Sequence, residues 1–103
     1  MTEKEKMLAG EVYSAVDEEL LRELNEVKEI IHEYNALPPS DNAGRLKILK
    51  NLIGHTADDD FIICQPFFCD YGKQISLGRR FFANFNFTVL DEAKVTIGDD
   101  CFI

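Results

Sequence analysis

The acid at position 91 occupies a place that the chain otherwise gives to aliphatic residues. Ile97 and Ile103 follow Asp91 at intervals of six residues, so the three share one position of a repeating pattern. In a six-residue β-helix repeat, the aliphatic at this position faces inward. A carboxylate buried alone carries a large free-energy cost, so Asp91 must be paired or face a cleft. We therefore take Asp91 as a candidate substrate-binding residue.

The sulfur-containing side chains form no recognisable chemical motif. Cys64, Cys69 and Cys101 make an odd number with no CxxC spacing, which favours neither a disulfide framework nor a zinc site. Cys101 occupies a small apolar position and is expected to serve packing. The sequence therefore predicts no bound metal.

The six-residue spacing extends beyond Asp91 and predicts the fold of the second half of the chain. Two sets of residues recur in phase: Ala83, Val89, Val95 and Cys101 are small and apolar, and Phe85, Asp91, Ile97 and Ile103 form the second set. This pattern is typical of hexapeptide β-helices, in which three hexapeptides form one triangular coil. The alternative is a group of ordinary short strands with similar spacing. Because residues 75–103 supply only about one and a half coils and solenoids need about three repeats, we expect a longer parent protein.

Three helices are predicted ahead of this region. Thr2 and Glu5 form a capping box for a short helix that Gly10 can end. Asp17 suits the N-cap of a second helix. The apolar stripe of that helix comprises Leu20, Leu21, Leu24, Val27, Ile30, Ile31 and Tyr34. A third helix is indicated by Leu46, Leu49, Leu52 and Ile53. We expect a helical segment over residues 1–57 and the start of a β-helix over residues 58–103.

Charge and hydropathy narrow the classes of partner. The net charge is −8, and residues 1–35 hold ten acids against four bases. Nucleic acids and anionic membranes both require a basic face, so neither is an expected partner. The sequence has no apolar run of membrane-spanning length and no signal peptide at its start. These features predict a cytoplasmic protein.

Several segments together resemble the maltose and galactoside O-acetyltransferases. They are "EKEKMLAGEVY", "HEYN", "CDYGKQISLGRRFFANFNFTVLD" and "VTIGDD", and they cover essentially the whole chain in order. The resemblance implies an N-terminal helical segment on a left-handed parallel β-helix of hexapeptide repeats, the trimeric-LpxA-like fold. It also implies a homotrimer that transfers acetyl from acetyl-CoA to a sugar hydroxyl, with active sites between subunits.

The resemblance places the catalytic base outside these residues. A sugar hydroxyl is a poor nucleophile and needs a base to accept its proton. In the family a histidine on the coil after "IGDD" does this, and residues beyond it hold CoA. His32 and His55 match neither position, so we expect both to be surface residues. The 103-residue chain by itself is therefore expected to be inactive.

The acceptor side of the site falls within the chain. Asp70 matches a position of the family that contacts sugar hydroxyls, and a turn residue before Gly72 is the alternative. Asn84 matches an asparagine that faces the reacting centre and can stabilise an oxyanion, with an asparagine ladder as the alternative. Glu92 matches an acceptor contact of the galactoside branch. Phe82 replaces a tyrosine of some members and is expected to form an apolar wall under the sugar.

Two other classes of protein remain open. A metal-dependent hexapeptide hydratase would need histidine ligands between coils, and none precedes Ile103. A non-catalytic trimerising or capping fragment is the second alternative. The coding sequence after Ile103 would discriminate between all three.

Overall fold

The computed structural model describes residues 1–103 as three helices followed by seven short strands. The helices are α1 (Glu3–Leu8), α2 (Glu18–Ala36) and α3 (Asn42–Leu52). The strands are β1 (His55–Thr56), β2 (Ile62–Ile63), β3 (Phe67–Cys69), β4 (Ile75–Leu77), β5 (Phe82–Ala83), β6 (Phe87–Val89) and β7 (Val95–Ile97). No helix is both long and apolar enough to cross a membrane.

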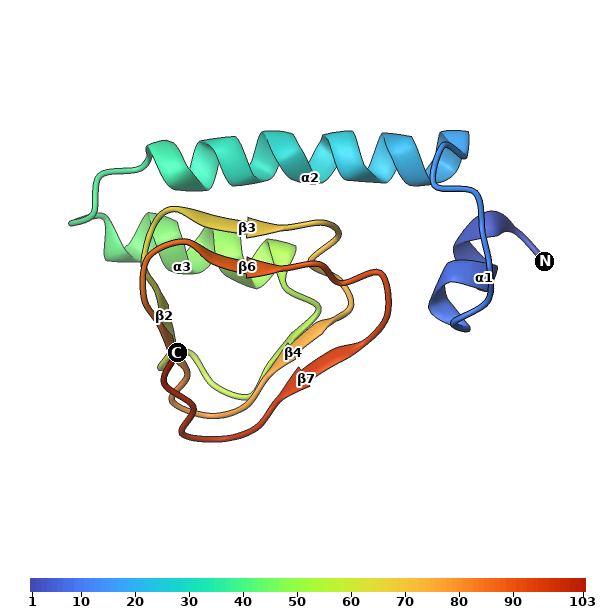
Figure 1. The fold of residues 1–103 in the computed structure, drawn as a ribbon. Helices are drawn as coiled ribbons and strands as arrows, with labels where there is room; N and C mark the ends of the chain where they lie inside the picture. Colours follow the sequence, from blue (N-terminus) through green and yellow to red (C-terminus); the bar gives the residue numbers. More distant parts are fainter.

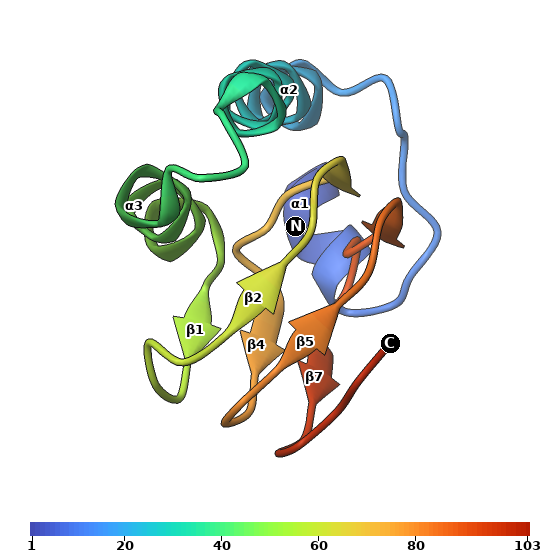
Figure 2. The ribbon, with the colours of Figure 1, turned by 90° about the vertical axis from the view of Figure 1, so that its left-hand side faces the viewer.

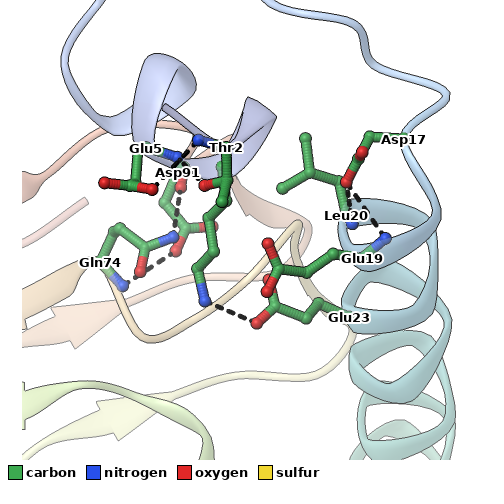
Figure 3. A network of polar contacts seen from close by, with 9 residues as sticks. Thr2, Glu5, Asp17, Glu19, Leu20, Glu23, Gln74 and Asp91 are labelled. Carbon is green, nitrogen blue, oxygen red and sulfur yellow. Dashed lines mark hydrogen bonds and ion pairs between the residues drawn. The ribbon is translucent and has the colours of Figure 1, made fainter.

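The helix starts follow the predicted capping residues. The Thr2 hydroxyl accepts a hydrogen bond from the Glu5 amide, and the Glu5 carboxylate accepts one from the Thr2 amide, both at 3.0 Å. Asp17 accepts from the amides of Glu19 and Leu20 at the start of α2 (Figure 3). These bonds satisfy amides that have no partner inside the helix. The three predicted helices are therefore confirmed.

The strands form the first coils of a parallel β-helix. Strands β1 to β4 each pair in parallel with the strand three places later, giving the sheets β1-β4-β7, β2-β5 and β3-β6. Viewed along the coil axis, the three sheets outline a triangle (Figure 1). Helices followed by the start of a hexapeptide β-helix are thus the observed architecture.

The coils begin earlier in the chain than the six-residue pattern indicated. β1 begins at His55 and already pairs with β4, so two coils precede β7, and residues 55–57 do not belong to the helical segment. Residues that pair between β2 and β5, and between β3 and β6, are 20 residues apart in the sequence. Three hexapeptides would supply roughly eighteen residues, so each coil contains extra residues. The extra residues lie in the turns, where they interrupt the periodicity.

The small apolar residues of the first six-residue set face the inside of the coils. The second set contains both buried and exposed residues. Ala83 and Val89 are buried, and Val95 and Cys101 pack against the same core. Phe85, expected to point inward, is 71% exposed. It lies in the turn between β5 and β6, beside Asn86 with a left-handed φ of 63°. The prediction for Phe85 was wrong because residues 84–86 of this turn are all exposed, which interrupts the alternation of inward and outward side chains.

Helices cover one end of the coils and leave the other open. Helix α3 lies beyond β1, whereas β7 and the C-terminus lie at the opposite end (Figure 2). Leu49 and Leu52 of α3 are buried in the main core. Helix α2 runs alongside β3, where the Asn35 side chain both accepts from and donates to the Phe67 backbone. Phe102 and Ile103, at the open end, are 79% and 54% exposed.

Candidate active site

Asp91 is a buried acid that holds together two turns of adjacent coils. Its side chain has no exposed surface. One carboxylate oxygen accepts from the Tyr71 amide at 2.8 Å. The other accepts from the Gln74 amide at 3.3 Å (Figure 3). The Gln74 side chain also donates to the Asp91 carbonyl at 3.2 Å. Burial raises the pKa of Asp91, and the amide hydrogen bonds oppose this effect.

Two alternatives were expected for Asp91, a paired carboxylate or one that faces a cleft, and the structure shows the first. The carboxylate is paired, with backbone amides as its partners, and does not face a cleft. A direct contact with substrate would require the turn to open. In the structure as it stands, Asp91 fixes the turn between Tyr71 and Gln74, which follows directly after Asp70.

Glycine at position 72 makes this turn compatible with the helices above it. Gly72 has a left-handed φ of 78°, and a Cβ there would lie 2.6 Å from the Leu52 carbonyl oxygen. Any other residue would therefore be strained and would collide with the end of α3. The turn is thus clamped between Asp91 on one side and α3 on the other.

Asp70 and Glu92 form a carboxyl pair at this corner. Both side chains are half-buried. Burial, followed by a hydrogen bond to Asp70 and its charge, raises the pKa of Glu92 to about 7. With a pKa of about 7, Glu92 carries a proton in part of the molecules at neutral pH, so the pair offers both a donor and acceptors. It can therefore donate to one hydroxyl and accept from another.

Tyrosine side chains complete the acidic corner. Burial raises the pKa of Tyr71 to about 12, and Tyr13, Glu92, Asp70 and Glu23 add to the shift. Tyr71 belongs to a small core with Met7 and Leu20, packed against Tyr13. Sequence reasoning missed Tyr71 and Tyr13 as members of the site. No pattern pointed to them, since contacts between coils and helices bring them together.

The other two predicted residues lie at a different corner of the coils. Phe82 is half-buried on β5, and its ring lies 5.9 Å from that of Phe102 in the next coil. Asn84 is exposed, and its amide group donates to the Ile103 carbonyl at 3.0 Å. Asn84 thus bonds to the backbone of the next coil, and its role at the reacting centre stays a prediction. Strand β6 separates this corner from Asp70 and Glu92, so one copy of the chain does not bring the five predicted residues together.

The histidines and cysteines do not contribute to either corner. His32 and His55 are exposed, as expected for surface residues. Burial raises the pKa of the Cys69 thiol far above its usual range, so it is not a nucleophile. No group of three or more histidine, cysteine or acidic side chains is arranged to hold a metal ion.

The chain matches known proteins over nearly its full length. Residues 6–57 match the family described as the maltose acetyltransferase hexapeptide capping motif. The galactoside O-acetyltransferase of Escherichia coli is 32% identical over 96% of this chain and 48% of its own. The crystal structure of a maltose O-acetyltransferase from Clostridium difficile superposes with a TM-score of 0.94 at 38% identity, covering 99% of this chain and 54% of that one.

A further solved structure carries a ligand. It is a hexapeptide-repeat acetyltransferase from Vibrio cholerae complexed with acetyl coenzyme A, with a TM-score of 0.83, 34% identity, and coverage of 100% of this chain and 55% of that one. The fold is that of the helical cap and first coils of hexapeptide-repeat proteins, and the matched proteins of this class are acetyltransferases. The chain belongs to the maltose acetyltransferase family with its hexapeptide capping motif. It spans about half the length of the relatives that it matches.

Proposed function

We propose that the protein represented by this chain transfers an acetyl group from acetyl-CoA to a hydroxyl of maltose, glucose or a galactoside. The observation that carries the proposal is the likeness to a maltose O-acetyltransferase over 99% of the chain. The neighbour complexed with acetyl coenzyme A supports acetyl-CoA as the donor. In this proposal the coils continue as a left-handed β-helix.

The reaction assigns distinct tasks to residues inside and outside this chain. The sugar oxygen attacks the thioester carbonyl carbon, its proton passes to a base, and the C–S bond breaks to release CoA. His32 lies on the outer surface of α2, and His55 is exposed on the first coil, so neither is placed beside the carboxyl pair as that base. The proposal therefore assigns the base and the coils that hold CoA to residues other than these 103.

The chain provides the acceptor side of the reaction. Asp70 accepts from one sugar hydroxyl, and Glu92 in its protonated form donates to another, which selects a polyol. Asn84 donates to the developing oxyanion in place of its present bond to Ile103. Phe82 provides an apolar wall. Asp91 contributes by fixing the turn that carries Asp70.

The separation of the two corners supports a homotrimer. Asn84 follows β5, and the carboxyl pair lies at the ends of β3 and β6, so a strand length keeps them apart within one copy. Copies packed side by side around a threefold axis would bring the Asn84 corner of one copy against the carboxyl corner of its neighbour. A site between subunits would then contain both groups.

A CoA-release assay tests the proposal. The 103-residue chain and the full-length product of its gene should be compared with acetyl-CoA and maltose, glucose or a galactoside. We expect sugar-dependent release from the full-length protein, and none from the 103 residues because loss of a general base alone costs about 10²–10⁴ in rate. Absence of sugar-dependent release in the full-length protein would reject the function. Turnover by the 103 residues would reject the division of roles and favour a base within them.

A further inference from the structure

An open groove runs over the outer face of strands β4 and β7, beside α1. Its volume is about 600 Å³, within the ~300–1,000 Å³ range of pockets that hold small organic ligands. The two strands that form its floor make one side of the triangle in Figure 1, and Leu8 of α1 forms an edge. Gln74 lines the groove and also donates to the Asp91 carbonyl, so the groove adjoins the carboxyl corner.

Hydroxyl groups stand side by side on the floor of the groove. Ile75 and Leu77 of β4 are buried in the core, so the Ser76 side chain between them points outward. Ser76 pairs with Thr96 of β7, and both residues line the groove. Paired strands lie about 4.8 Å apart, so the two hydroxyls can donate to the same ligand group.

The groove is basic, although the chain as a whole is acidic. Lys73 and Lys94 line it, both are exposed, and neither takes part in an ion pair. None of the lining residues is acidic, and Glu92, two positions before Lys94, is not among them. Lys73 donates one hydrogen bond, to the Asn51 carbonyl at 2.9 Å, and its remaining N–H groups can donate further. The groove therefore offers two positive charges and no competing carboxylate.

A phosphate ester matches this set of donors better than other small ligands do. It carries about two negative charges at neutral pH and three strong acceptor oxygens, enough for two ammonium groups and a hydroxyl. A carboxylate has one charge and two oxygens, and a cation would be repelled by the lysines. The volume of the groove leaves room for an organic group beside the phosphate. Leu8 and Ala93 would supply the apolar contacts to that group.

We propose that this groove binds a small organic phosphate ester, with the ammonium groups of Lys73 and Lys94 on the phosphate. The hydroxyls of Ser76 and Thr96 donate to the same phosphate, and the organic group lies against Leu8. Binding requires neither acetyl-CoA nor a sugar acceptor. The proposal therefore does not rest on the proposed acetyl transfer.

Phosphorus NMR with phenyl phosphate and inorganic phosphate tests the proposal on the chain as it is. Binding broadens the ³¹P line of the ligand, and the method tolerates self-association of the protein. We expect both ligands to bind and sulfate, but not acetate, to displace them. Phenyl phosphate should bind about three- to tenfold more tightly than inorganic phosphate, as expected if its ring buries about 25–55 Å² of apolar surface.

Two pairs of variants test the lysine and the hydroxyl. Lys94→Gln should weaken phenyl phosphate binding by about two- to fivefold, as expected for an exposed ion pair. Its matched control is Lys28→Gln, because Lys28 is exposed on α2 and does not line the groove. Thr96→Val should weaken binding by about two- to fivefold through loss of a hydrogen bond. Its control is Thr88→Val, at an exposed site on β6, and circular dichroism would verify that each variant is folded.

Three outcomes would overturn the proposal. One is the absence of line broadening for phenyl phosphate at concentrations up to tens of millimolar. Another is an equal loss in Lys94→Gln and Lys28→Gln, which would mean that the ligand is attracted to lysines in general. The third is equal affinity for inorganic phosphate and phenyl phosphate, which would reject an ester as the ligand. The assay contains no acetyl donor, so none of these results would bear on acetyl transfer.

Discussion

Replacing Glu92 with glutamine should stabilise the chain at high pH more than at low pH. The pKa of Glu92 rises from its ordinary 4.5 to about 7, chiefly because the side chain is buried and next because Asp70 lies against it. The folded chain thus holds this proton more tightly than the unfolded chain does. The stabilisation is present below about pH 4.5 and is lost as the pH rises through about 7.

The size of the effect follows from the shift. At about 1.4 kcal/mol per pKa unit, a rise from 4.5 to about 7 corresponds to about 3 kcal/mol. Because the side chain is only partly buried, solvent screening reduces the expected difference to about 1 kcal/mol. Glu92→Gln removes the titration and should therefore gain about 1 kcal/mol relative to the parent chain between about pH 5 and about pH 8.

Urea denaturation followed by circular dichroism measures this difference. Both proteins should be compared at one fixed concentration, since any self-association makes stability depend on concentration. Glu33→Gln is the matched control, because it removes the same charge from an exposed site on α2. A relative stability of Glu92→Gln that is the same at both pH values, or that falls as the pH rises, would refute the raised pKa of Glu92.

Three further predictions concern the two corners and the open end. Under the proposed acetyl transfer, Asp70→Ala in the full-length protein should mainly raise KM for sugar. Asn84→Ala should mainly lower kcat, because its bond to the oxyanion strengthens only as charge develops. Equal small effects of both variants in steady-state kinetics would favour the turn role of Asp70 and the ladder role of Asn84. Asp91→Ala should lower the free energy of unfolding by about 2–4 kcal/mol in urea denaturation, because it leaves the Tyr71 and Gln74 amides buried without an acceptor. A decrease of less than about 1 kcal/mol would mean that water replaces the carboxylate. The 103-residue chain should associate as its concentration rises in analytical ultracentrifugation, because β7 and the exposed Phe102 form an uncovered edge; a single monomeric species with cooperative unfolding would contradict this.

The helices could be predicted from the sequence because their signals are local. A cap such as Asp17 acts on amides two and three residues away, and the stripe from Leu20 to Tyr34 depends only on the helical period. The ends of the helices also follow from local chemistry, since Pro38 cannot continue α2. Nothing beyond the neighbouring turn is needed for either prediction.

The start of the first coil, at β1, fell outside the β-helix predicted over residues 58–103 for the opposite reason. Strands β1 and β2 have two residues each, too few for a period to be visible. Their assignment as strands depends on β4 and β5, with which they pair 20 or 21 residues further along the chain. The later coil was found because Ala83, Val89, Val95 and Cys101 keep their phase across its turns.

The carboxyl corner shows why a single period could locate a site but not describe it. The six-residue pattern marked Asp91 as misplaced, yet that acid is satisfied by backbone amides of the preceding coil. Its burial leaves Glu92, the next residue, half-exposed at the same corner as Asp70, which lies about one coil earlier in the sequence. Burial, and next the contact with Asp70, raise the pKa of Glu92, so the ionised form of Glu92 costs stability, and a purely structural turn has no need of such a group. The buried acid therefore supports the turn, whereas the destabilising pair beside it is the better candidate for contact with a substrate.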